Sequence, residues 1–151
     1  MNKARYTLRN ITDADYEFIY RVKKEAYRKY VEMYFGGWDE DRQREFFAAF
    51  METYRGGARI IVSDGNDVGF YNGETTSDGY EIGNICVIPG YRNRGIGTAV
   101  LEDIIAEYSD RTISLRYFKA NPVGRLYERL GFRLIGETEV HCLMAKEATE
   151  K

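Results

Sequence analysis

The sequence predicts a single α/β domain in which a mixed, mostly antiparallel sheet is flanked by helices. Three observations lead to this fold class. Short alternating runs mark several strands, two amphipathic segments near the N-terminus mark helices, and a strand–loop–helix–strand unit in the middle requires one parallel strand pair. The 151 residues suit one domain, 1–151, with a sizeable core and no linker or internal repeat.

The first half of the chain predicts one strand and two helices. A strand is expected over residues 6–11, where apolar and polar residues alternate. Thr12 and Asp15 resemble a capping box that opens a helix over 13–30, with an inner face of Phe18, Ile19, Val22 and Ala26. Paired glycines interrupt that helix, and Asp39 then caps a second helix over about 40–54, with an inner face of Phe46, Phe47, Phe50 and Met51.

The second half predicts strands separated by tight turns and by two helices. Strands are expected over 58–64, 68–74, 80–88, 112–118, 132–137 and 139–145, and helices over 95–108 and 122–130. The first two of these strands form a hairpin about "GND", and proline stands in the first turn of the last helix. Residues 146–151 are expected to be a frayed tail.

Composition excludes several classes of protein. With 22 basic and 24 acidic residues the net charge is −2, which suggests neither a nucleic-acid-binding surface nor a disordered acidic tail. We expect no membrane span and no signal peptide, because no segment has the required apolar length. Cys86 and Cys142 lie in strand-like runs without a spacing motif, so we expect inert thiols in a cytoplasmic protein rather than a disulfide.

The junction "GYRNRGIGTAVL", residues 90–101, turns a loop into an apolar helix. A helix N-terminus presents unpaired N–H groups and a partial positive charge. Gly95 and Gly97 leave that backbone accessible, while Arg92 and Arg94 add charge, so the pattern R-x-x-G-x-G indicates an anion site. The two usual nucleotide-binding glycine patterns are not present. The alternative is a glycine-assisted helix start with solvated arginines.

Two segments together resemble the GNAT superfamily of N-acetyltransferases. "EIGNICVIPGYRNRGIGTAVL" is followed in the family's order by "NPVGRLYERLGF", and the resemblance spans roughly residues 80–132. It implies a GNAT-like fold and a transferase that moves an acetyl group from acetyl-CoA, its co-substrate, to a primary amine. The amine would attack directly in a ternary complex, without a covalent enzyme intermediate.

The resemblance also implies where acetyl-CoA binds. The pyrophosphate would lie on the backbone of residues 93–98 and the pantetheine along 85–87, where the strand splays from its neighbour after a bulge at Gly83–Asn84. The implied cofactor-binding residues are Ile85, Cys86, Val87, Arg92, Asn93, Arg94, Gly95, Ile96, Gly97, Thr98 and Asn121. Asn121 stands six residues before Tyr127 where family members commonly have seven, which turns it by about 100° on a helix.

Tyr127 and Glu81 are the catalytic candidates. A lysine-like amine has a pKa of about 10.4, so its deprotonation at pH 7 costs roughly 4–5 kcal/mol and benefits from a base. Glu81 matches the base of several family members; His141, a water, or an exposed strand glutamate without catalytic role are the alternatives. Tyr127 matches the tyrosine that faces the departing sulfur, where it would hydrogen-bond or protonate the thiolate; a packed helix tyrosine is the alternative.

The acceptor stays open at this stage. A small amine or polyamine-like cation suits the mild acidity of the chain, and a protein N-terminus or lysine side chain is the second possibility. Tyr34, Trp38 and Asp39 lie in the break that overhangs the acceptor side in the family. No metal is expected, because no ligand cluster exists. The rival interpretations are a non-catalytic acyl-CoA sensor and a partner-binding domain, and a homodimer is left open.

Overall fold

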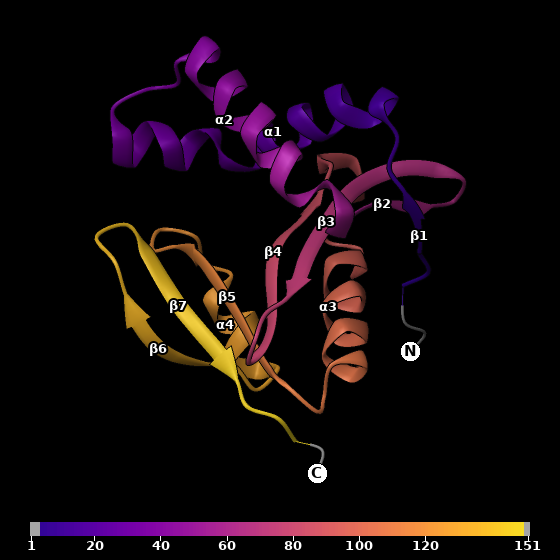
Figure 1. The fold of residues 1–151 in the computed structure, drawn as a ribbon, viewed down its shortest axis with the longest axis vertical. Helices are drawn as coiled ribbons and strands as arrows, with labels where there is room; N and C mark the ends of the chain where they lie inside the picture. Colours follow the sequence, from indigo (N-terminus) through magenta and orange to yellow (C-terminus); the bar gives the residue numbers. More distant parts are fainter. Residues whose placement is uncertain (1–3, 150–151) are drawn as a thin grey trace.

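The structure is a computed structural model that describes residues 4–149 (Figure 1). The described chain forms one seven-stranded sheet in the order β1-β2-β3-β4-β5-β7-β6, together with four α-helices. The elements are β1 (Thr7–Asn10), α1 (Tyr16–Phe35), α2 (Glu40–Tyr54), β2 (Ala58–Ser63), β3 (Asn66–Thr75), β4 (Gly79–Val87), α3 (Ile96–Glu107), β5 (Thr112–Phe118), α4 (Gly124–Arg129), β6 (Arg133–Glu137) and β7 (His141–Lys146). The predicted fold class is confirmed.

The sheet contains one parallel pair, β4 with β5, and the other five pairings in the described chain are antiparallel. The helix α3 connects the two parallel strands, as the strand–loop–helix–strand unit predicts. Two cores lie on opposite faces of the sheet. One is built around α3 with residues such as Val100, Leu101 and Ile113, and the other joins α1 and α2 to Ile60 and Phe70.

The start of α1 confirms the predicted capping box. The Thr12 N–H donates to Oδ2 of Asp15 at 2.8 Å, and the box opens a short 3-10 turn over Asp13–Asp15 that leads into α1. The carboxylate of Asp15 also pairs with Arg9 at 2.8 Å, and this hydrogen-bonded guanidinium lowers the pKa of Asp15 to about 2. The helix continues five residues beyond the predicted end, to Gly36, whose left-handed φ of 84° terminates it.

The second helix begins where predicted, because the Asp39 side chain accepts from the Arg42 N–H at 3.1 Å. Phe47 and Met51 are buried one turn apart, but Phe46 is 58% exposed, so its placement on the inner face is wrong. Phe46 precedes Phe47 by one residue, about 100° around the helix, and its ring lies on the solvent side beside the Arg42 guanidinium.

The end of the described chain contacts the turn between α3 and β5. Lys146 is the last residue of β7, and the Thr149 N–H donates to the Ser109 carbonyl at 2.9 Å. Residues 150–151 of the expected frayed tail, like residues 1–3, lie outside the described residues. No helix in residues 4–149 is long and apolar enough to cross a membrane.

Candidate active site

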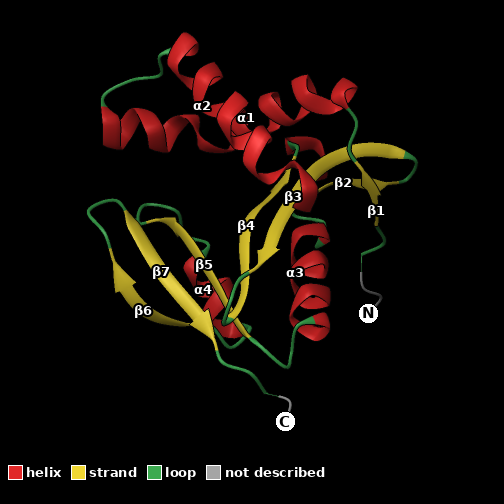
Figure 2. Cartoon of the chain, viewed as in Figure 1, coloured by secondary structure: helices red, strands yellow, loops and turns green. Residues whose placement is uncertain are grey.

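The two parallel strands β4 and β5 diverge after a short common stretch (Figure 2). They pair only at Gly79–Glu81 with Thr112–Ser114, although β4 runs on to Val87 and β5 to Phe118. At the vertex the strands come very close: a Cβ on Gly79 would lie 2.2 Å from the Thr112 carbonyl oxygen. Glycine there allows the contact that begins the opening.

A bulge in β4 accompanies this divergence. Asn72 of β3 faces Asn84, while the next residue, Gly73, faces Ile82, so Gly83 is an extra residue in β4. The predicted bulge at Gly83–Asn84 is therefore confirmed. Beyond it, within the described residues, β4 has no strand partner on its β5 side. Its backbone there is an open edge to which an extended ligand can add like a strand.

The N-terminus of α3 is an accessible anion-binding backbone. Asn93 and Gly95 both adopt left-handed conformations, with φ of 62° and 82°. The first helical bond runs from the Ala99 N–H to the Gly95 carbonyl at 2.9 Å, so the N–H groups of residues 96–98 have no acceptor within residues 4–149. A Cβ on Gly97 would meet no atom within 4 Å. This backbone can hold a phosphate, as the motif predicts.

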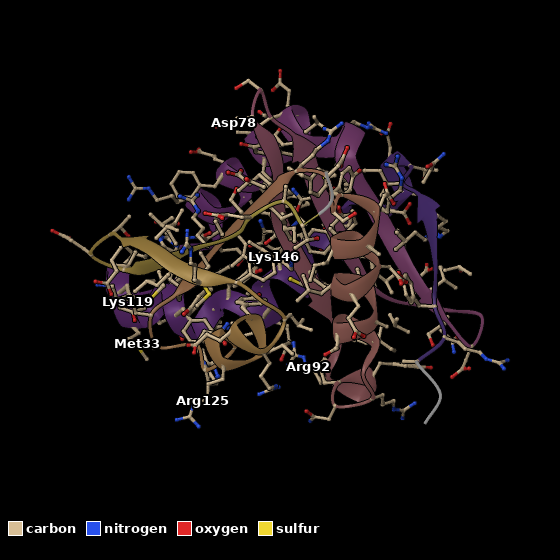
Figure 3. The ribbon with its side chains drawn as sticks, turned by 90° about the horizontal axis from the view of Figure 1, so that it is seen from below. Met33, Asp78, Arg92, Lys119, Arg125 and Lys146 are labelled. Carbon is tan, nitrogen blue, oxygen red and sulfur yellow. The ribbon has the colours of Figure 1, made fainter. Side chains whose placement is uncertain are left out.

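The two arginines of the motif have different surroundings. Nε of Arg92 donates to the Val87 carbonyl at 2.8 Å, and its guanidinium also pairs with Glu25 of α1. Arg92 thus ties the end of β4 to α1, and Figure 3 shows it on the side of the molecule where α3 and α4 lie, with Arg125 on the same side. The Arg94 guanidinium lies 4.8 Å from the Tyr91 ring centre and pairs with no carboxylate of the described chain, so its charge remains available to an anion.

Tyr127 lies on α4 against the core that contains α3. Its ring packs against Tyr117 and Phe132, with centroids 5.6 Å and 6.0 Å away. The hydroxyl makes no hydrogen bond within residues 4–149, and burial, with Cys86 and Tyr117 nearby, raises its pKa to about 12. The phenol is therefore protonated at neutral pH and is free to donate. Because its pKa exceeds that of a thiol, about 8.5, donating a hydrogen bond to a thiolate is favoured over protonating it.

A chain of hydrogen bonds lines β4 on the face covered by α1. The Cys86 thiol donates to the Tyr27 hydroxyl at 3.3 Å, and this hydroxyl donates to Oδ1 of Asn84 at 2.8 Å. Nδ2 of Asn84 donates in turn to Oδ1 of Asn72 at 2.7 Å. Cys86 is buried and burial raises its pKa, as expected for an inert thiol. Tyr27 was not among the residues predicted from the sequence, although its spacing of eight from Ile19 puts it on the inner face of α1.

Glu81, Asn121 and His141 lie on different segments of the chain. Glu81 is exposed on β4, opposite Glu74 of β3 and Ser114 of β5, and faces the α1 side because its neighbours Tyr80 and Ile82 enter the α3 core. Oδ1 of Asn121 accepts from the Val123 N–H at 3.1 Å in the turn before α4.

His141 stands on β7 and stacks on Phe118 with ring centres 4.6 Å apart. Burial and the charge of Arg116 lower the pKa of this histidine, which favours the neutral imidazole.

The second half of α1 spans the open ends of the two strands. Tyr30 and Tyr34 stack on Phe118 of β5 at 5.5 Å and 5.7 Å, and the Tyr34 hydroxyl accepts from the Ala120 N–H at 2.9 Å. The Trp38 ring packs beside the α1 and α2 core, and its Nε1 donates to Glu40 at 2.8 Å. The aromatic residues of the second half of α1 thus border the open end of β5 on the face of the sheet away from α3.

A comparison with family models matches the "Acetyltransferase (GNAT) domain" to residues 55–134, which is more than half of the chain. The chain therefore belongs to the GNAT acetyltransferase family. No curated protein sequence matches it significantly.

Solved structures share this fold at low sequence identity. PH1933 from Pyrococcus horikoshii OT3 is 20% identical with a TM-score of 0.73, covering 97% of this chain and 100% of that one. The PaiA N-acetyltransferase from Thermoplasma acidophilum, solved in complex with coenzyme A, is 17% identical with a TM-score of 0.69, covering 95% and 99%. The ribosomal-protein-S18-alanine N-acetyltransferase from Escherichia coli is 22% identical with a TM-score of 0.67, covering 97% and 96%.

Proposed function

We propose that the protein transfers an acetyl group from acetyl-CoA to a primary amine by direct attack in a ternary complex. The observation that carries this proposal is the opening between β4 and β5, which has an anion-binding backbone near one end and the free Tyr127 hydroxyl beside it. The coenzyme A in the PaiA complex supports the choice of co-substrate. The two free cysteines suit the reducing cytoplasm, where we expect the protein to act.

The residues present fit acetyl-CoA along this opening. The unpaired N–H groups of residues 96–98 would bind the pyrophosphate, with Arg94 adding positive charge. The pantetheine would then follow the open edge of β4 at Ile85–Val87 as an added strand. This placement brings the thioester toward Tyr127 and leaves the α1 face of the opening to the acceptor.

The chemistry is an acyl transfer without an enzyme-bound intermediate. The amine nitrogen attacks the thioester carbonyl carbon, the carbon–sulfur bond breaks, and coenzyme A leaves as its thiolate. Tyr127 donates a hydrogen bond to the developing charge on sulfur. Glu81, directly or through water, takes the proton that the amine loses, with neutral His141 as the second candidate base.

Release of free thiol from acetyl-CoA with a broad amine panel tests this function. We expect Tyr127→Phe to lower kcat by about 100-fold, in the range for loss of one positioned donor, with little change in coenzyme A affinity. Glu81→Gln should lower activity more at pH 7 than near pH 10, because at the higher pH much of the amine is already deprotonated. Tyr16→Phe, which removes a hydroxyl bonded to Arg55 far from the opening, is the matched control and should behave like the wild type.

One outcome would contradict the proposed function, and another would contradict the role of Tyr127. Tight coenzyme A binding without acetyl transfer to any amine or protein would favour the acyl-CoA sensor. Unchanged turnover in Tyr127→Phe would remove that residue from the mechanism while leaving the transferase intact. The S18-alanine acetyltransferase among the structural neighbours, named for a protein acceptor, is the reason to include peptide N-termini and lysine in the panel beside small amines.

A further inference from the structure

The side-chain ammonium of Lys23 is largely buried between α1 and α2. Its Nζ lies 3.7 Å from the ring centre of Phe50 on α2 and 5.9 Å from that of Tyr27. It forms no ion pair within residues 4–149, whereas the next residue, Lys24, pairs with Glu40 at 2.8 Å. Burial lowers the pKa of Lys23 to about 8. Within residues 4–149, Lys23 is thus a desolvated cation that contacts aromatic faces and no carboxylate.

Lys23 also lies beside the opening between β4 and β5. Tyr27, one helical turn further along α1, bonds to Asn84 and Cys86, the β4 residues just beyond the bulge. The positive charge of Lys23 acts on the Cys86 thiol and lowers its pKa against the effect of burial. The same thiol raises the pKa of Tyr127, which packs against the core on the other face of the sheet. Lys23 therefore reaches the α1 face of the opening, which the proposed function leaves to the acceptor.

An unpaired ammonium in such a place is costly. Removing a charge from water is unfavourable unless an opposite charge or hydrogen bonds compensate, and the Phe50 face compensates only in part. A methionine of similar length would fill the same space between α1 and α2 without that cost. Within the described chain the ammonium contacts aromatic faces and no carboxylate, which indicates that an anionic partner arrives with a ligand.

We propose that Lys23 binds a carboxylate carried by the acceptor, so that the acceptor is an amino acid rather than a simple amine or polyamine. This inference rests on the proposed function, since it concerns the second substrate of the same site. A carboxylate next to the reacting amine would form a charge-assisted hydrogen bond with Nζ in desolvated surroundings, where such bonds are strong. A polyamine would instead bring a second cation toward Lys23 and be repelled.

Matched acceptor pairs test this proposal. The kcat/KM of thiol release is measured with phenylalanine against phenethylamine and with leucine against isopentylamine, pairs that differ only in the carboxylate. We expect the wild type to prefer the amino acid at least tenfold, mainly through KM. Lys23→Met should abolish the preference, Lys23→Arg should retain part of it, and Lys24→Met, which removes the neighbouring half-buried charge that pairs with Glu40, should keep all of it.

Equal rates within each pair, a preference for the decarboxylated amine, or an unchanged preference in Lys23→Met would each overturn the assignment. The absence of thiol release with both the amino acids and the amines would also overturn it. In that case, a separate measurement of coenzyme A binding shows whether the proposed cofactor site is correct. The melting temperature of Lys23→Met checks folding. It should equal or exceed that of the wild type, because the substitution removes a desolvated charge.

Discussion

The substitution Gly97→Ala separates cofactor binding from protein stability. A Cβ at this position would meet no atom within 4 Å, and Gly97 does not have a positive φ, so the free protein accommodates alanine without strain. Gly97 is the second residue of α3, where alanine is favoured over glycine by up to about 1 kcal/mol. We therefore expect the melting temperature of the free protein to rise by roughly 2–4 °C.

The same methyl group should weaken coenzyme A binding. If the pyrophosphate lies on the N–H groups of residues 96–98, the new Cβ stands at the surface that the phosphate must approach. We expect the Kd for coenzyme A to rise at least tenfold, which corresponds to about 1.4 kcal/mol. Because the free protein becomes more stable, this loss of affinity cannot be caused by unfolding.

Calorimetric titration with coenzyme A and thermal unfolding with and without the ligand measure both effects. Gly56→Ala is the control, since a Cβ there also meets nothing within 4 Å but lies in the turn after α2. The control should bind coenzyme A like the wild type. A Gly97→Ala protein that is more stable and also binds coenzyme A with unchanged affinity would refute the placement of the pyrophosphate.

Two further predictions concern the stability of the fold. Gly79→Ala should destabilise the fold by about 1–3 kcal/mol in urea unfolding, because its Cβ would lie 2.2 Å from the Thr112 carbonyl oxygen; unchanged stability would show that the strands can separate there freely. The Asp15 carboxyl has a folded pKa of about 2 against 3.8 in its ordinary state, so its pairing with Arg9 stabilises the fold above about pH 5 and loses this effect as the pH falls toward 2. Asp15→Asn should lower the free energy of unfolding by roughly 1–2 kcal/mol at pH 7, allowing for the solvent around Arg9. Between pH 5 and 2 the stability of this variant should fall less steeply than that of the wild type, and an equally steep fall would contradict the role of Asp15.

The order of the elements and the parallel pair could be predicted from the sequence because they depend on local patterns. Alternation, the caps at Thr12 and Asp39, and the glycine turns each act within a few residues. The errors concern positions decided by packing. Phe46 is apolar and lies next to a buried phenylalanine, but only the contacts of α2 with the sheet show which side faces inward. The end of α1 depends on the left-handed conformation of Gly36.

The features of the site also divide into those set by the local sequence and those set by contacts between distant residues. The R-x-x-G-x-G segment and the bulge near Gly83 are local features, and both could be identified from the sequence. The bond from Tyr27 to Asn84 joins residues 57 positions apart, and the pairing of Arg92 with Glu25 joins residues 67 apart, so no spacing rule could reveal them. The pairing of Arg92 with α1 in particular depends on the way α1 crosses the end of β4.

The most direct test of the central claim is an NMR titration of the 15N-labelled protein with coenzyme A. We expect saturable shifts that are largest for the amides of residues 96–98 at the start of α3 and of 85–87 on the open edge of β4. A cavity of about 470 Å³ lined by Arg5, Asp64 and Asp103 lies elsewhere, between the start of β1, the β2–β3 turn and α3. Shifts centred on that cavity, or none that saturate, would show that coenzyme A does not bind along the opening between β4 and β5.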